Sequence, residues 1–228
     1  MDPLIEQSYY YNERASEYDE CFERIGRYDR GDENNRRWLD AVQAVRAEID
    51  AFRPTGNVLE LAPGTGNWTW QLSKHADRVV AVDFSESMLH VCRQKVKSRN
   101  VEYLQADIFS FQPSEQFDTI FFGLWISHVP KEKAADFWAM VASALKSGGR
   151  VLFVDTLPNP IITAHDHEMP NGSTEIERRK LNDGRSFQIV KRYFTPTSIQ
   201  MELELLGWKC SAKSIDDCFL FATAEPDT

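Results

Sequence analysis

The sequence predicts a doubly wound α/β fold in which helices cover both faces of a mostly parallel sheet. Short, nearly continuous apolar segments alternate with helix-like segments over residues 58–154, and apolar strands of this kind are typical of sheets buried on both faces. After Asp155 the alternation stops, and a loop, a hairpin signal, one helix and two closely spaced strands follow. We therefore expect a seven-stranded sheet with an antiparallel last strand and an inserted β-hairpin after the fifth strand.

The N-terminal part, residues 1–53, is expected to form helices that cap the core. Apolar residues recur at steps of three and four from Trp38 to Phe52, the spacing of one stripe on an amphipathic helix. Pro54 and Gly56 end this helix. The preceding segment from Gly26 to Asn35 is charged and is expected to be a loop.

The central part, residues 54–156, is expected to be the cofactor-binding core. Its strands are predicted at residues 58–62, 79–82, 101–105, 118–122 and 151–154. Ser85 is placed to cap a helix. Gly148 and Gly149 are expected to close the helix at residues 134–145.

Two further parts complete what we take as one domain spanning residues 1–228. Residues 157–194 contain a proline-bearing loop, then two strand-like segments that flank Asn182-Asp183-Gly184, a strong hairpin signal. We expect this insertion to form a lid on the substrate side. Residues 195–228 contain a helix at 197–206 and strands at 208–215 and 219–224, which are close enough to pair antiparallel.

The composition argues against several classes of protein. The 26 basic and 35 acidic side chains leave a net charge of −9, which disfavours nucleic-acid binding. There is no apolar run of about 18 residues to cross a membrane, and the N-terminus lacks the apolar core of a signal peptide. The four cysteines show no CxxC spacing, so we expect free thiols and a cytoplasmic location.

A turn of small residues follows the first predicted strand. Ala62, Gly64 and Gly66 let the backbone approach a ligand at the carboxyl end of the strand, where open parallel sheets bind ligands. The dinucleotide fingerprint GxGxxG does not fit, because Thr69 stands at its third glycine. Glu60 lies beside the turn, and an acidic group there suits a ligand with an ammonium or sulfonium charge. The competing interpretation is an ordinary turn between strand and helix.

Two carboxylates follow the next two strands. Asp83 ends the second strand, 19 residues after Gly64, and is placed to accept hydrogen bonds from ribose hydroxyls. Asp107 follows the third strand, where it can accept from an adenine amino group while Ile108 packs on the ring. The competing interpretation of each carboxylate is a helix cap or a surface residue.

Together these features resemble the class I S-adenosylmethionine-dependent methyltransferases over about residues 58–154. Glu60-x-Ala62-x-Gly64-x-Gly66 is similar to the acidic, glycine-rich first motif of the family, with Ala62 in place of the usual first glycine. Further segments resemble the motifs of the second, fourth and fifth strands; they are residues 80–88, 117–130 and 145–151. Residues 10–19 are similar to an N-terminal helix that folds over the cofactor in a group of small-molecule methyltransferases.

The resemblance implies a Rossmann-like methyltransferase fold and a cofactor, S-adenosylmethionine (SAM), which leaves as S-adenosylhomocysteine (SAH). It also implies roles for individual residues: Ala62 and Gly64 at the amino-acid part of the cofactor, Asp83 at the ribose, and Tyr11 at the cofactor carboxylate or in closing the site. The full set of implied cofactor residues is Tyr11, Arg14, Tyr18, Glu60, Ala62, Gly64, Gly66, Asp83, Phe84, Met88, Asp107, Ile108, Phe122 and Gly123.

The chemistry implied by such a cofactor is in-line displacement at a methyl group already activated on a sulfonium. The protein must align the reactants and exclude water, and a general base is needed only if the nucleophile carries a proton. His128, just after the fourth strand, is a candidate base, with a packing histidine as the alternative. His167 lies with His165 in the loop after the fifth strand, as a substrate contact or as part of a solvated loop. His165 and His167 have no third ligand at usable spacing, so no metal is expected.

The candidate substrate-binding residues are Trp125, Arg178, Arg179 and Tyr193. The basic residues of the hairpin either bind an anionic substrate such as a carboxylate or protect strand edges by charge. We expect methyl transfer from SAM to an oxygen or nitrogen of a small molecule, by a monomer or homodimer with no nucleic-acid or membrane partner. The alternatives are an inactive methyltransferase-fold binding protein and a nucleotide-dependent oxidoreductase.

Overall fold

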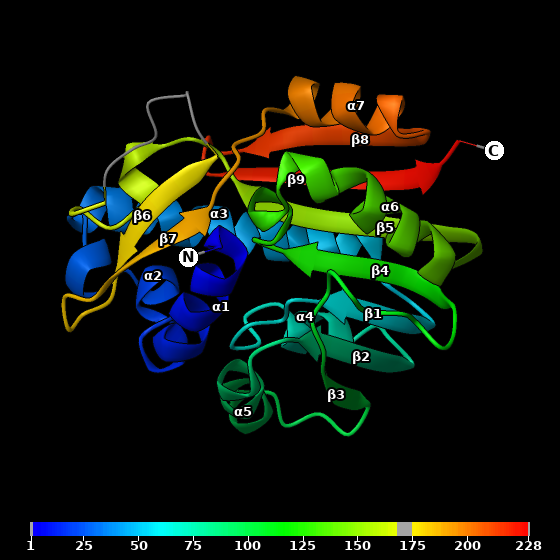
Figure 1. Cartoon of the computed structure of the whole chain (residues 1–228), viewed down its shortest axis with the longest axis horizontal. Coiled ribbons are helices and arrows are strands. Elements are labelled where there is room, and N and C mark those ends of the chain that lie inside the picture. The colour runs from blue at the N-terminus through cyan, green and yellow to red at the C-terminus, as the bar shows by residue number, and fades with distance from the viewer. Residues whose placement is uncertain (1, 168–174, 228) are drawn as a thin grey trace.

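The structure is a computed structural model that describes residues 2–167 and 175–227. Over these residues, one seven-stranded sheet runs through the molecule in the order β3-β2-β1-β4-β5-β9-β8 (Figure 1). Its strands are β1 (Asn57–Leu61), β2 (Arg78–Asp83), β3 (Val101–Gln105), β4 (Phe117–Gly123), β5 (Leu145–Thr156), β8 (Trp208–Ile215) and β9 (Phe219–Pro226). The first five pair in parallel, and β9 is antiparallel to both β5 and β8. The predicted fold class is confirmed.

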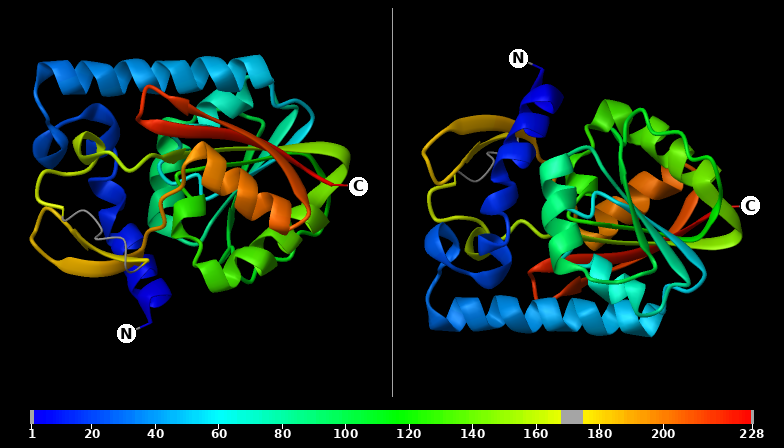
Figure 2. Two further views of the ribbon diagram at one scale, coloured as in Figure 1. Left: turned by 90° about the horizontal axis from the view of Figure 1, so that it is seen from above. Right: turned by 90° about the horizontal axis from the view of Figure 1, so that it is seen from below.

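Helices cover the sheet on both faces, as Figure 2 shows. The helices of the core are α3 (Asp32–Phe52), α4 (Thr69–Ser73), α5 (Glu86–Lys95), α6 (Ala134–Ala144) and α7 (Pro196–Leu205). Successive strand residues point to opposite faces, so Val58 joins the apolar cluster under α3 while Leu59 joins the cluster under α6 and α7. This burial on both faces explains why the strands have continuous apolar sequences.

A cap lies at the end of the sheet where the parallel strands finish (Figures 1 and 2). It consists of the N-terminal segment and a separate two-stranded hairpin, β6 (Ile176–Lys180) and β7 (Ser186–Val190), against which α1 packs. The N-terminal elements are α1 (Pro3–Glu13), η1 (Arg14–Ser16), α2 (Glu20–Glu23) and η2 (Gly26–Tyr28). The short helices elsewhere in the described chain are η3 (Ile126–His128), η4 (Lys131–Lys133) and η5 (Pro160–Ile162).

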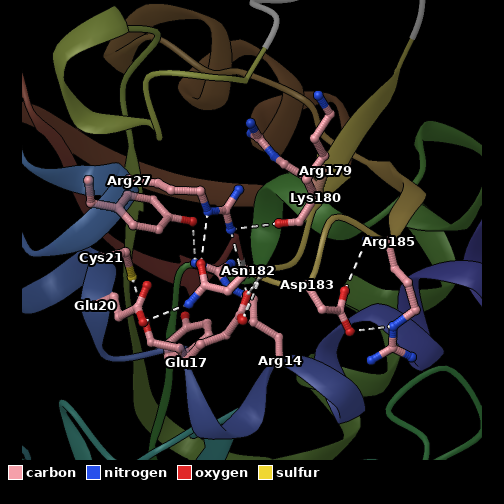
Figure 3. A network of polar contacts seen from close by, with 12 residues as sticks. Arg14, Glu17, Glu20, Cys21, Arg27, Arg179, Lys180, Asn182, Asp183 and Arg185 are labelled. Carbon is pink, nitrogen blue, oxygen red and sulfur yellow. Dashed lines mark hydrogen bonds and ion pairs between the residues drawn. The ribbon is translucent and has the colours of Figure 1, made fainter.

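Hydrogen bonds tie the N-terminal segment to the hairpin (Figure 3). Arg27 donates to the carbonyl of Lys180 at 2.7 Å and to the side chain of Asn182 at 2.9 Å. The amide of Asn182 donates to the Glu17 carboxylate at 2.9 Å, and its side chain donates to Glu20 at 2.7 Å. These contacts hold two segments that are more than 150 residues apart in the sequence against each other.

Three expectations about local structure are wrong. The predicted loop from Gly26 to Asn35 is helical from Asp32 onward, because acidic residues in a first turn favour the positive end of the helix dipole. Gly148 and Gly149 do not close a helix; they lie inside β5, and α6 ends before them at Ala144.

The second hairpin strand ends at Val190 rather than at residue 194, because its backbone finds other partners. The Val190 amide donates to the Gln7 side chain, and the Arg192 amide donates to the carbonyl of Ser127. The expected loop at residues 157–174 is described as far as His167, so Glu168 and Pro170 lie outside the described residues.

The cysteine prediction is confirmed in part, since Cys21, Cys92, Cys210 and Cys218 are all free. Within the described part of the chain, no helix has the length and apolarity that a membrane crossing requires.

Candidate active site

The turn after β1 forms the floor of the first cavity. Ala62 and Gly64 adopt left-handed backbone angles, with φ of 54° and 56°. The Gly64 amide donates to Oδ2 of Asp83 at 3.1 Å, and the Ser85 amide donates to Oδ1 of the same carboxylate at 2.9 Å. These bonds fix the Asp83 carboxylate at the carboxyl edge of the sheet. Burial raises its pKa to about 6.

This first cavity, the cofactor cavity, lies where β1, β2 and β4 end. It is lined by Tyr11, Tyr18, Ala62, Gly64, Asp83, Phe84, Met88, Gly123, Leu124, Trp125 and His128. An adjoining groove of about 350 Å³ contains Asp107 and Ile108, and α1 contributes Leu4 and Ile5 to its wall. A carboxylate at the ribose position, apolar side chains around it and a further carboxylate in the groove suit a nucleoside ligand such as SAM.

Three residues assigned to the cofactor do not line the cofactor cavity. A side chain at Gly66 would come within 2.7 Å of the Cys92 sulfur, so this glycine serves the packing of α5 against the turn. Glu60 and Phe122 are buried and do not line the cavity. Burial raises the pKa of Glu60 to about 8, so its side chain is mostly protonated at neutral pH.

A second cavity, the acceptor cavity, lies between the cap and the sheet. It has a volume of about 90 Å³. Its lining residues come from four separate segments and are Tyr11, Arg14, Tyr18, Cys21, Tyr28, Trp38, Leu124, His128, Thr156, Ile162, Thr163, His167, Arg179, Ile189, Lys191 and Tyr193. Tyr11, Tyr18, Leu124 and His128 line both cavities, so they form a wall that the two cavities share.

His128 lies in this shared wall, and its hydrogen bonds define its tautomer. Its Nδ1 lies 2.7 Å from the carbonyl oxygen of Val190, which can only accept, so Nδ1 carries the proton. Nε2 is then the acceptor and receives the hydroxyl of Tyr11 at 2.8 Å. Burial, and next the charge of Lys191, lower the pKa of His128 to about 3. The ring is therefore neutral at physiological pH and offers one lone pair to the site.

Arg14 carries the charge that the acceptor cavity leaves unbalanced. Its guanidinium lies over the rings of Tyr10, Tyr18 and Tyr28, 4.8–5.6 Å from their centroids, and donates to the Tyr28 hydroxyl at 2.6 Å. It is 7% exposed. Among the residues that the structure describes, no carboxylate forms an ion pair with it, so the cavity has an uncompensated positive charge.

The other two cations of the cavity are paired. Lys191 lies 3.3 Å from Asp155 and donates to the Ser127 hydroxyl at 2.7 Å. Arg179 forms a buried ion pair with Glu177, its neighbour on the inner face of the hairpin. Each pair is close to neutral, which leaves Arg14 to set the net charge of the cavity.

The structure brings most of the candidate substrate residues together, with two exceptions. Arg179, Tyr193 and His167 line the acceptor cavity. Arg178 is exposed on the opposite face of the hairpin, because side chains alternate along a strand. Trp125 lies on the cofactor side and not in the acceptor cavity.

Two assignments from the sequence change in detail. Arg14 was expected at the cofactor, but it lines only the acceptor cavity. His165 is exposed, and its ring contacts the carbonyl of Arg27. Over the residues that the structure describes, no group of three or more ligating side chains could hold a metal ion, and metal independence stays a prediction.

Sequence reasoning missed Tyr28 and Glu177, and it named Lys191 only as one of the basic residues of the hairpin that could bind an anionic substrate. Glu177 and Arg179 share one face of a strand with opposite charges, and this spacing is a signal that the sequence did contain. Tyr28 follows a charged segment without periodicity, so no pattern pointed to it.

Comparisons with known proteins agree with this geometry. Residues 58–149 match a family model described as a methyltransferase domain. The solved DhpI–SAH complex is 37% identical to the chain, with a TM-score of 0.81, and the match covers 98% of this chain and 97% of that one. DhpI is also known in a complex with SAM and HEP, which matches equally well. An S-adenosylmethionine-dependent methyltransferase from Clostridium acetobutylicum shares the fold at 18% identity, with a TM-score of 0.62 and coverage of 96% and 99%.

Curated relatives match over a shorter stretch. A ubiquinone/menaquinone biosynthesis C-methyltransferase from Enterobacter sp. (strain 638) is 34% identical over 63% of this chain and 61% of its own length. A demethylmenaquinone methyltransferase from Lactococcus lactis is 32% identical over 44% of this chain and 42% of its own length. The chain thus spans about half the length of these relatives. The family model and the match along the whole of DhpI show that the chain belongs to the S-adenosylmethionine-dependent methyltransferases.

Proposed function

We propose that this protein transfers the methyl group of SAM to an oxygen of a small anionic molecule bound in the acceptor cavity. The observation that carries the proposal is the pair of cavities with a common wall, one suited to a nucleoside and the other containing the uncompensated charge of Arg14. A buried charge without a partner is costly, so an anionic ligand has a strong electrostatic reason to bind there.

The polarity of the acceptor cavity supports an anionic acceptor. The curated relatives are named for quinone biosynthesis. A neutral, apolar acceptor would leave Arg14 without a counter-ion, so the charge of Arg14 argues against such an acceptor here. An ammonium-bearing acceptor would be repelled by Arg14 and gains no free carboxylate, since Asp155 and Glu177 are already paired.

In the mechanism we propose, the chain positions reactants rather than moving protons. SAM supplies a methyl group activated on its sulfonium. Arg14 holds the charge of the acceptor, and Tyr11, Tyr18 and Leu124 exclude water from the shared wall. An oxyanion has no proton to lose, so no general base is required. His128, with its pKa of about 3, orients Tyr11 or the acceptor through the Nε2 lone pair.

A methyl-transfer assay on a small acceptor panel tests the proposal. HEP comes first, because it binds together with SAM in DhpI. Small carboxylates, a primary amine and a hydroquinone complete the panel. We expect SAH formation with at least one anionic compound, and competition between the anions. Turnover with the hydroquinone alone would show instead a C-methyltransferase like the curated relatives, and SAM binding without turnover on any compound would favour an inactive binding protein.

The variant His128→Gln tests the role of this residue. Glutamine keeps a hydrogen-bond acceptor without being a base, so kcat should stay within about tenfold of wild type. A loss of roughly 100-fold or more, the scale of general-base catalysis, would show that His128 removes a proton. A cytoplasmic location and a monomeric or homodimeric state complete the proposal, and gel filtration checks the second.

A further inference from the structure

The two histidines of the acceptor cavity present opposite hydrogen-bonding faces. Nη1 of Arg179 donates to Nδ1 of His167 at 2.8 Å. A guanidinium has no lone pair to offer, so Nδ1 of His167 must be the unprotonated nitrogen. In the neutral ring Nε2 then carries the hydrogen, whereas Nε2 of His128 carries the lone pair. At Nε2, His167 is therefore a hydrogen-bond donor, whereas His128 is an acceptor.

This donor has no partner among the residues that the structure describes. Nε2 of His167 is buried, and within residues 2–167 and 175–227 no atom accepts from it. A buried donor without an acceptor destabilises the free protein, and a ligand oxygen that accepts from it removes this cost. Burial, followed by the charge of Arg179, lowers the pKa of His167 to about 2, so the ring is neutral at physiological pH.

The hydrogen-bonding role of a neighbouring side chain, Tyr28, is fixed in the same way. Arg14 donates to the Tyr28 hydroxyl at 2.6 Å, so the hydroxyl hydrogen of Tyr28 must point elsewhere. The Tyr28 ring meets the His167 ring edge to face, with centroids 6.1 Å apart. Two arginines thus turn two neutral neighbours, His167 and Tyr28, into donors on one side of the cavity.

We propose that His167 sets acceptor specificity by donating from Nε2 to a second oxygen of the acceptor, distinct from the oxygen that receives the methyl group. His167 lines the acceptor cavity but not the wall shared with the cofactor, so it faces the distal end of the acceptor. Glu177 is a positioning residue, because its ion pair with Arg179 holds the guanidinium against Nδ1. This inference rests on the proposed function, since it adds a second oxygen to the small anion proposed above.

The test uses binding to the SAH complex, measured by calorimetry, so it does not depend on turnover. The probes are glycolate, 3-hydroxypropanoate and 4-hydroxybutanoate, each compared with the carboxylate in which a methyl group replaces the hydroxyl. A site built to bond a hydroxyl rejects the analogue that lacks it. We expect wild type to prefer the hydroxylated member by about tenfold or more at one chain length.

The variants then assign this preference to His167. His167→Leu should abolish the preference while binding the methyl analogue as wild type does. His167→Gln should keep most of it, since the amide can accept from Arg179 and donate to the ligand. Glu177→Gln should reduce the preference and leave SAH affinity unchanged. His165→Leu, an exposed histidine in the same loop, is the matched control and should behave as wild type.

The outcomes separate the inference from the proposed function. If wild type binds carboxylates but shows no preference at any length, or if His167→Leu retains the preference, the inference is wrong and the proposed function stands. If no carboxylate in either series binds, the inference is wrong, and the methyl-transfer assay on the full panel decides separately whether the proposed function stands. Unchanged SAH affinity and thermal unfolding in each variant show that the cap has folded.

Discussion

The two cavities on either side of Tyr11 and His128 are built from different kinds of structure. The cofactor cavity is made mostly of the ends of β1, β2 and β4 and the turns that follow them. The acceptor cavity is made of side chains from the N-terminal segment, η3, the loop after β5 and the hairpin. The first is set by the geometry of a parallel sheet, whereas the second depends on charge pairing between distant segments. This difference leads to separable effects of mutation.

The largest separable effect is expected at Arg14. Arg14→Gln should raise the acceptor KM by about 10- to 150-fold, because hydrogen bonds to a charged group contribute about 1.5–3 kcal/mol. SAH affinity should stay within twofold. The melting temperature should not fall, since the variant removes a buried charge that lacks a counter-ion. Steady-state kinetics, calorimetry and thermal unfolding measure these three quantities.

Arg185→Gln is the control for this prediction, because Arg185 pairs with Asp183 and Glu13 on the surface and lines neither cavity. An acceptor KM that stays at the wild-type value in Arg14→Gln would remove the electrostatic basis of the proposed function.

The reverse pattern is expected at Asp83. Asp83→Ala should weaken SAH binding by about 1–3 kcal/mol, because the ribose hydroxyls lose a buried acceptor. The acceptor KM, measured at saturating SAM, should change little. Calorimetry with SAH provides the first value. If SAH affinity falls and the acceptor KM rises by the same factor, the two cavities are energetically coupled.

The pH dependence of cofactor binding should follow Asp83. Its pKa of about 6 in the free protein is raised by burial, and ribose donors favour the charged form, so binding lowers this pKa. Affinity for SAH should therefore be full above pH 6 and fall as the pH drops through 6, by up to about tenfold per unit. Asp83→Asn should lose affinity at pH 8 and lack this dependence. If the SAH affinity of Asp83→Asn still falls as the pH drops through 6, another group is responsible.

A smaller effect is expected from the contacts that close the cap. Arg27→Ala removes the bonds to Lys180 and Asn182 (Figure 3). It also removes an ion pair to Asp166. These groups are partly exposed, so stability should fall by no more than about 1 kcal/mol. Hydrogen exchange in β6 and β7 should nevertheless speed up, while exchange in β1 stays the same. Uniform acceleration would show that cap and core unfold together.

No effect is expected from chelators. Neither cavity gathers enough ligating side chains for a metal among the residues described. Turnover should therefore survive incubation with a chelator followed by gel filtration. Activity that is lost and then restored by one divalent ion would place a metal in the acceptor cavity.

The cofactor cavity and the acceptor cavity also differ in how far the sequence predicts their residues. Asp83, Gly64 and Ser85 could be placed from the sequence, because each lies at the end of a strand or the start of a helix and its role depends on local geometry. Glu177 was missed although it lies two residues before Arg179 on the same strand, whereas the pairing of Lys191 with Asp155 could not be predicted, because these residues lie 36 positions apart.

Burial corrected the assignments that chemistry alone suggested. Arg178 and Arg179 are adjacent and chemically identical, yet one is exposed and the other lines the acceptor cavity. Glu60 is acidic in the sequence but, enclosed in the core, has a pKa of about 8. Strand register decides the first difference, and loss of hydration decides the second.

The sequence by itself determined the sheet, its strand-end turns and the position of the Asp83 carboxylate at the end of β2, because these follow from periodicity and spacing within short segments. Only the tertiary structure decided the acceptor cavity. Its polarity depends on which cations find carboxylates and which histidine nitrogen is held by a carbonyl or a guanidinium. His128 and Val190 lie 62 residues apart and Lys191 and Asp155 lie 36 residues apart, so these two pairings exist only after the cap has folded onto the sheet.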